Sequence, residues 1–219
     1  IHGVGAHGAY PQAGKDPIVL AAAIITSLQT LVSREVSPLE PAVVTVGSIH
    51  AGTKHNIISD RADLQLTVRS YSEEVRQKLL QGIERIAVNQ ARALGFPEDK
   101  LPEVVNGNEG TPSLWNDPQL VERNVAVLQE ALGRENVLAT EKVMGGEDFA
   151  RYGRVDPAIP SHMLRLGSLA PMRYQAYIAG GEIPPSLHSP FYTPVADVTI
   201  ETGVEAMTAM VLDLLSSTP

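Results

Sequence analysis

The order of hydrophobic patterns in the first 106 residues is the feature that most limits what this chain can fold into. Apolar residues that alternate with polar ones predict strands, and apolar residues on one helical face predict helices. The expected elements are strands at 1–9, 42–50, 61–70 and 102–106, with helices at 16–37 and 72–95. This β-α-β-β-α-β order is the split βαβ or ferredoxin-like plan, whose helices cover one face of the sheet. Its open edge invites pairing with another chain, so we expect this region to dimerise.

Local signals predict where the two helices begin and which faces they bury. Asp16 is placed to cap the first helix, Pro17 suits its first turn, and Ser72 opens the second. The first helix is expected to bury Ile18, Ala22, Ile25, Leu28 and Val32. The second is expected to bury Val75, Leu79, Leu80, Ile83 and Ala87.

The pattern changes after about residue 112, which predicts a second region at 111–219. The expected elements are helices at 117–132 and 196–215, a short helix within MGGEDFARY, and strands near 137–140 and 162–167. The last helix is expected to turn Val204, Met207, Val211 and Leu215 inward. These helices lack a sheet large enough to cover them, so we expect this region to be part of a larger α/β domain and the chain to be a piece of a longer protein.

Charge and composition exclude several functions. A net charge of −8 argues against a nucleic-acid surface, which needs a basic face. The absence of cysteine excludes disulfides and thiolate metal sites, and a cytoplasmic location fits this composition. The longest apolar run, 18–25, is too short to cross a bilayer, so no membrane segment is expected.

The opening Gly3-Val4-Gly5-Ala6-His7-Gly8 matches the glycine pattern of dinucleotide-binding loops but lacks their context. Such a loop needs a full strand before it and a helix directly after it, whereas Pro11 follows Gly8 by three residues. We therefore expect no nucleotide. Small neighbours on both sides of His7 would instead let a large group approach the imidazole, which could donate to a developing oxyanion.

Two further candidates lie in the second region. His188 sits on a loop bounded by prolines, a suitable place for a metal ligand, although a loop histidine more often bonds a carbonyl. Glu147 follows Gly145-Gly146 and opens a short helix. Its carboxylate either caps that helix or points into a cleft that the glycines leave open, and spacing alone does not decide between these alternatives.

Two polar residues of the first region could hold a carboxylate. Asn56 lies in the loop between the central strands and could bond its own turn or donate to a substrate. Arg69, near the end of a strand, could bind a carboxylate through two parallel hydrogen bonds, whereas a surface ion pair is the plainer alternative.

Four separated segments together resemble the M20 metallopeptidases, closest to the branch with hippurate hydrolases and plant auxin-conjugate hydrolases. In chain order they are GVGAHGAYPQAGKDPIVLAAAIITSLQTLVSRE, AGTKHNIISDRADLQLTVRS, MGGEDFARY and LHSPFYTP. The resemblance implies a ferredoxin-like lid and dimerisation domain at 1–110, and at 111–219 the C-terminal part of a catalytic domain that binds two divalent metals, Zn or Mn. It also implies a homodimer through the lid.

The same resemblance implies roles for single residues. His188 matches the last metal ligand, and His7 matches a lid histidine that reaches a neighbouring subunit's site and steadies the oxyanion. Asn56 and Arg69 match positions that hold the substrate carboxylate, and Glu147 matches an acid near the metals. The implied reaction is hydrolysis of the amide bond of N-acyl amino acids or related small amides.

The family's Cys/His/Asp metal motif and its Glu-Glu pair do not occur in this sequence. We therefore expect the chain by itself to hold no metal stably and to be inactive. The alternative hypothesis is a non-catalytic dimerisation or small-molecule-binding module, because the split βαβ plan also serves that purpose.

Overall fold

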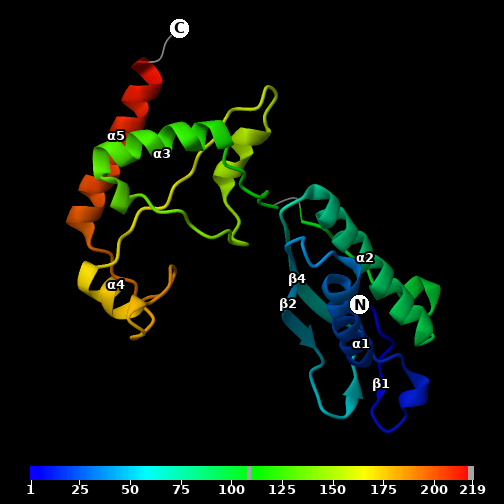
Figure 1. Cartoon of the computed structure of the whole chain (residues 1–219). Helices are drawn as coiled ribbons and strands as arrows, with labels where there is room; N and C mark the ends of the chain where they lie inside the picture. Colours follow the sequence, from blue (N-terminus) through cyan, green and yellow to red (C-terminus); the bar gives the residue numbers. More distant parts are fainter. Residues whose placement is uncertain (108–109, 217–219) are drawn as a thin grey trace. The chain divides into compact units, whose positions relative to one another are not determined.

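The computed structural model describes residues 1–107 and 110–216, and its internal contacts divide the chain into two compact units (Figure 1). Unit 1 contains Ile1–Ser113 together with Val143–Gly146, and unit 2 contains Leu114–Lys142 and the chain from Glu147 onward. Unit 1 combines helices with antiparallel strand pairs, and unit 2 is helical with long connecting segments. The mixture confirms the predicted α+β class.

The two helices of unit 1 begin where the capping signals predicted. Helix α1 spans Pro17–Thr30 and continues as the π-helical turn η2, Leu31–Glu35. The Asp16 carboxylate accepts a hydrogen bond from the backbone N–H of Ile18 at 2.8 Å. Helix α2 spans Glu73–Ala93, and the Ser72 hydroxyl accepts from the Val75 N–H. Short 3₁₀ turns lie at η1, Pro11–Ala13, and η3, Glu98–Lys100.

Four strands form two antiparallel pairs. Strand β2, Ala42–Ala51, pairs with β4, Ala62–Ser70, and an irregularity at Gly47 separates the Val46–Leu66 pair from the Ser48–Gln65 pair. Strand β1, Ala6–His7, pairs with β3, Ile57–Ile58. The expected strand at 1–9 is therefore shorter, preceded by isolated bridges from His2 to Arg61 and from Val4 to Lys15. No strand forms at 102–106, where the expectation was wrong: Leu101 and Val104 pack against the core without joining a ladder.

The core of unit 1 lies where α1 and α2 pack together and against the β2–β4 pair. Its fully buried leucines are Leu20, Leu28, Leu31 and Leu79. The helices meet closely at Gly82, where an added Cβ would lie 2.4 Å from a Leu31 methyl. The expected face of α1 is confirmed at Leu28 but was wrong at Ile18, which is 43% exposed, while Leu20, Ala21 and Ile24 are buried. Helix α1 is apolar nearly all round, so periodicity could not select the face.

By length and composition alone, Pro17–Glu35 is apolar enough to cross a membrane, contrary to the sequence expectation. A helix buried in the core of a soluble protein passes the same test, so length and composition are weak evidence that this helix crosses a membrane. In this chain the helix contributes three fully buried leucines to the core of unit 1.

Unit 2 contains helices α3, α4 and α5, with bounds Pro118–Leu132, Pro171–Ile178 and Ala196–Ser216. Helix α3 begins where expected, with the Asp117 carboxylate accepting a hydrogen bond from the Leu120 N–H, and 3₁₀ turns lie at η4, Arg134–Asn136, and η5, Asp148–Arg154. The expected strands at 137–140 and 162–167 are extended segments that join no sheet, so these two expectations were wrong. Helix α4 was not foreseen.

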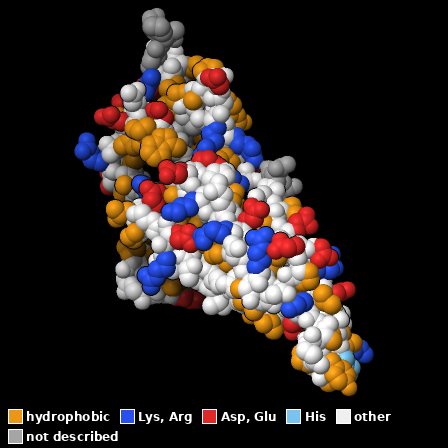
Figure 2. Space-filling model, turned by 90° about the vertical axis from the view of Figure 1, so that its right-hand side faces the viewer, with side chains coloured by type: hydrophobic (Ala, Val, Ile, Leu, Met, Phe, Trp, Pro, Cys, Tyr) orange, Lys and Arg blue, Asp and Glu red, His pale blue; other side chains and the backbone are white. Residues whose placement is uncertain are grey.

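The core of unit 2 is small. Only Leu128, Ala206 and Met210 form its buried apolar cluster within the described residues, with Leu132, Val137 and Leu164 packed against it. The expected inward face of α5 was wrong, because Val204, Met207, Val211 and Leu215 are 45% to 69% exposed. Hydrophobic side chains accordingly reach the surface in Figure 2, among them patches over the C-terminal helix. These side chains have no sheet to pack against in unit 2.

Candidate functional site

His7 and Asn56 are neighbours in unit 1. His7 pairs with Ile57 across the β1–β3 ladder, and the Gly8 N–H donates to the Asn56 carbonyl at 2.7 Å. Both side chains are exposed. The structure therefore brings together two of the five predicted site residues at the short β1–β3 pair.

The backbone selects which imidazole nitrogen of His7 is available. Nδ1 accepts a hydrogen bond from the Ala9 N–H at 3.0 Å. In a neutral imidazole the other nitrogen, Nε2, then carries the proton and acts as a donor. The ring also lies 5.8 Å from that of Tyr10, in a tilted arrangement. An exposed imidazole held in this tautomer is suited to donate to an anion or a polarised carbonyl.

The glycines around His7 serve a different purpose from the one expected. An added Cβ at Gly8 would lie 3.1 Å from the Asn56 carbonyl, and one at Gly3 would lie 2.7 Å from the Pro17 ring. These glycines therefore let the first segment pack closely on neighbouring backbone, instead of clearing space around the imidazole. Gly8 is followed by the short 3₁₀ turn η1 and not directly by an α-helix, which differs from the geometry of a dinucleotide-binding loop.

Arg69 lies near the end of β4, on the exposed face of the strand. Its Nη1 donates to the Met144 carbonyl at 2.9 Å, and the hydroxyl of Tyr71 donates to the Val143 carbonyl at 3.1 Å. Arg69 thus binds backbone, an arrangement that neither sequence alternative foresaw. Its contact with Met144 uses Nη1, and a planar guanidinium has further N–H groups along the Nε–Nη2 edge.

Glu147 follows the paired glycines and caps η5. Its carboxylate accepts a hydrogen bond from the Phe149 N–H at 3.3 Å, so the capping alternative describes what this side chain does here. The side chain is half-buried. One carboxylate oxygen is used in this bond, and the group keeps further acceptor positions.

His188 is exposed on a turn closed by the hydrogen bond from the Ser189 N–H to the Ser186 carbonyl. Its φ of 69° lies in the left-handed region that non-glycine residues seldom adopt. Strained backbone of this kind is often retained at functional sites. Within 1–107 and 110–216, no three His, Asp, Glu or Cys side chains are close enough to hold a metal ion. His188 alone does not make a metal site.

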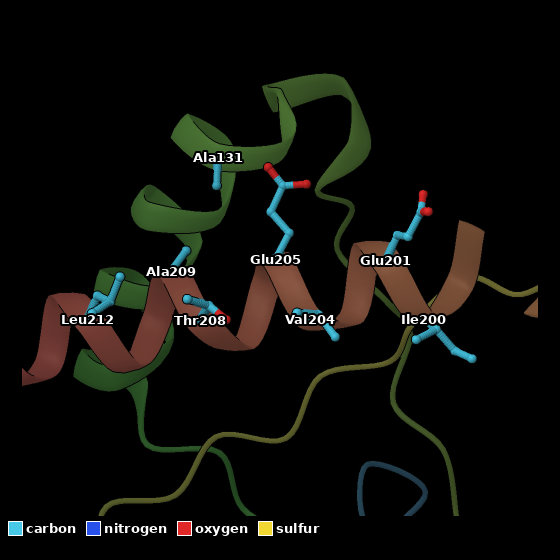
Figure 3. Close-up of a pocket in the computed structure, with 8 residues that line it drawn as sticks. All are labelled: Ala131, Ile200, Glu201, Val204, Glu205, Thr208, Ala209 and Leu212. Carbon is cyan, nitrogen blue, oxygen red and sulfur yellow. The ribbon is translucent and has the colours of Figure 1, made fainter. Parts of the chain in front are cut away.

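A shallow hollow in unit 2 runs along the exposed face of α5 (Figure 3). Its lining is mostly apolar, with Ala131 from α3 and Ile200, Val204, Ala209 and Leu212 from α5, and it includes the carboxylates of Glu201 and Glu205. None of the five predicted site residues lines it. We assign this hollow no chemistry.

The structure adds a contact between the buried Asn124 and the half-buried His162, which sequence reasoning missed. Nδ2 of Asn124, which is 4% exposed, lies 2.9 Å from Nδ1 of His162. Burial lowers the pKa of His162 below its ordinary value. Asn124 lies within an amphipathic helix pattern, so no local signal separates it from a surface residue.

Comparison with known proteins places these features in a family. The profile of the peptidase dimerisation domain matches residues 1–94. The chain is 33% identical over 198 residues to IAA-amino acid hydrolase ILR1-like 2 of Arabidopsis thaliana, covering 90% of this chain and 42% of the relative. It spans less than half the length of the curated relatives it matches, from 37% to 46% among those compared.

Two crystal structures share the fold. One, from methicillin resistant Staphylococcus aureus and described as an aminohydrolase, aligns with a TM-score of 0.73 at 30% identity, over 97% of this chain and 50% of the other. The second is Bacillus subtilis YXEP, described as a dinuclear metal binding peptidase from the M20 family. It aligns with a TM-score of 0.57 at 23% identity, over 93% of this chain and 47% of the other. The chain belongs to the M20 family of peptidases and amidohydrolases, and its first 94 residues are a peptidase dimerisation domain.

Proposed function

We propose that this chain is part of a metal-dependent amidohydrolase that hydrolyses the amide bond of N-acyl amino acids or related small amides. In this proposal residues 1–110 are the lid and residues 111–219 are part of the catalytic domain. The observation that carries it is His7, an exposed imidazole whose Nδ1 is occupied by the Ala9 N–H, so that Nε2 is the donor. Removing one oxyanion donor from an acyl-transfer site lowers kcat by about 10²–10³.

The remaining predicted residues have compatible chemistry. Arg69 keeps its Nε–Nη2 edge for a substrate carboxylate, and Asn56 supplies an exposed amide beside His7. His188 would be one ligand among several for two divalent metals, Zn or Mn. The described residues do not fit a two-metal site by themselves, so we derive no reaction step through the metals.

The test compares this chain with the complete catalytic protein. We expect the 219-residue chain to release no amino acid from N-acyl amino acids with added Mn²⁺ or Zn²⁺, and the complete protein to do so. In the latter, His188→Ala should abolish metal-dependent turnover, and His7→Ala should lower kcat by about 10²–10³. His50→Ala is the matched control, an exposed histidine of β2 outside the proposed site. Turnover by the short chain, or full activity of His7→Ala, would refute the proposal.

A second candidate is supported by the dimerisation-domain match: unit 1 is a homodimerisation module without catalysis. Strand β2 pairs with β4 along one edge, and no described strand pairs with its other edge. Such an edge can pair with a second copy in a two-fold arrangement. Light scattering should give twice the 23.5 kDa chain mass under both candidates. Loss of turnover in His188→Ala of the complete protein separates them, because a pure dimerisation module has no use for that side chain.

A further inference from the structure

A short piece of chain between the two stretches of unit 2 belongs to unit 1. Residues Val143–Gly146 group with unit 1 by their contacts, whereas Lys142 before them and Glu147 after them belong to unit 2. The chain thus contributes four residues to unit 1. It then continues into unit 2 at Glu147, whose carboxylate caps η5.

Two side chains of unit 1 hold this segment by consecutive carbonyl groups. Tyr71 donates its hydroxyl to the Val143 carbonyl at 3.1 Å, and Arg69 donates Nη1 to the Met144 carbonyl at 2.9 Å. Side chains two residues apart along an extended strand point to the same side. Arg69 and Tyr71 can therefore both reach this segment from the end of β4. Hydrogen bonds from a charged donor such as Arg69 are stronger than those between neutral groups.

Further contacts restrain both Tyr71, just after β4, and Gly146. The Ser113 hydroxyl donates to the Tyr71 carbonyl at 2.8 Å, which restrains the backbone that carries the Tyr71 ring. An added Cβ at Gly146 would lie 3.3 Å from the Thr111 Cβ and 3.6 Å from Nη1 of Arg69. The Gly146 backbone therefore passes directly beside the guanidinium group, where a larger residue would be crowded.

We propose that Arg69 and Tyr71 are positioning residues that fasten Val143–Gly146 to the end of β4 within unit 1, through the carbonyls of Met144 and Val143. Arg69 then has two tasks, because the guanidinium that holds Met144 also has the edge proposed for the substrate carboxylate. A carboxylate bound there would order the same side chain that holds the segment. Only this catalytic consequence rests on the proposed function; the fastening itself does not.

The chain offers a direct test of the fastening. Trypsin cleaves after Lys142, and the new end would lie at Val143, whose carbonyl Tyr71 holds. Tyr71→Phe removes only the hydroxyl, and Arg69→Met removes the charged donor. We expect cleavage after Lys142 to accelerate roughly fivefold to tenfold in each variant, the effect of losing one hydrogen bond, and more in the double variant. Cleavage after Lys54, in a loop of unit 1, should not change.

Two matched variants control for the strand and for the charge. Thr67→Ala alters the same exposed face of β4 two residues before Arg69, and Arg34→Met removes an exposed positive charge elsewhere in unit 1. Both should leave cleavage after Lys142 at the unaltered rate, and all variants should keep the melting temperature of the parent chain. Unchanged cleavage in both Tyr71→Phe and Arg69→Met would overturn the proposal.

The effect on catalysis is measured separately, by steady-state kinetics of the complete protein. Tyr71 has no proposed contact with substrate, so Tyr71→Phe should leave KM unchanged, whereas Arg69→Lys should raise KM. Faster cleavage after Lys142 with an unchanged KM in Arg69→Lys would retain the fastening and reject the second task of Arg69. An inactive complete protein would refute the proposed function and leave the proteolysis result standing.

Discussion

The two units of this chain differ in how much of their apolar surface they bury by themselves. Unit 1 has a cluster of eleven buried residues where α1 and α2 pack together and against the β2–β4 pair. Unit 2 has a cluster of three, and its last helix exposes valine, methionine and leucine side chains. A helix buries its apolar stripe only if another layer covers it. Unit 1 therefore contains its own second layer, whereas the described residues of unit 2 form helices without a sheet to cover them.

The largest expected effect tests this difference in the cores. Leu79→Ala in α2 should lower the free energy of unfolding of unit 1 by about 2–5 kcal/mol, because it empties a fully buried position. Met210→Ala in α5 should cost about 2 kcal/mol or less, since a small open core can collapse around the change. Urea unfolding followed by hydrogen exchange of α2 and α5 would measure both. Leu39→Ala, at a position 90% exposed, is the control and should be neutral.

A smaller effect concerns the exposed face of α5. Val204→Ser should change the unfolding free energy of this chain by no more than about 0.5 kcal/mol, because Val204 is 62% exposed. The neighbouring buried position gives the contrast: Ala206→Leu should cost about 1–3 kcal/mol by overpacking. Thermal unfolding measures both variants. If Val204→Ser destabilised the chain as much as Ala206→Leu, the face of α5 that carries Val204 would be covered. The difference in apolar burial between the two units would then be wrong.

The smallest expected effect is a pH dependence confined to unit 2. Burial lowers the pKa of His162 in the folded state below the unfolded value of about 6.5, so the unfolded chain binds more protons between the two values. The unfolding free energy of unit 2 should therefore decrease as the pH falls through about 6.5 toward the lower folded pKa. Melting curves from pH 7.5 to 5.5 would show it.

His162→Gln is the variant that tests this interpretation, since it removes the titrating ring beside Asn124. Its melting temperature should lose this part of the pH dependence, while His50→Gln, at an exposed histidine of β2, should retain it. An identical pH dependence in His162→Gln would assign the effect to other groups.

Signals that act within a few residues were read correctly from the sequence. Asp16, Ser72 and Asp117 cap α1, α2 and α3, because each cap needs only a side-chain oxygen next to the first free N–H groups of its helix. The polar face of β4 likewise follows from alternation along one strand. The M20 relationship was also recognisable, because its four motifs occur in order along the chain.

The predicted face of α2 is confirmed at Val75, Leu79, Ile83 and Ala87, but the faces of α1 and α5 required the tertiary structure. Helix α1 is apolar on several sides, so only its partners decide that Leu20 is buried and Ile18 is not. The exposed valines of α5 have the periodicity of a buried face, but no strand in the described part of unit 2 covers them. His7 could be chosen as a candidate from the sequence, but its tautomer follows from the Ala9 N–H.

The sequence by itself determined where α1, α2 and α3 begin, the alternation of β4 and the family, because these depend on short-range geometry or on ordered motifs. Only the tertiary structure decided that Arg69 and Tyr71 hold the carbonyls of Met144 and Val143, more than 70 residues away. A carbonyl is the same group in every residue, so its partner leaves no trace in the residue types. Distance in space, set by packing of the whole unit, makes that choice.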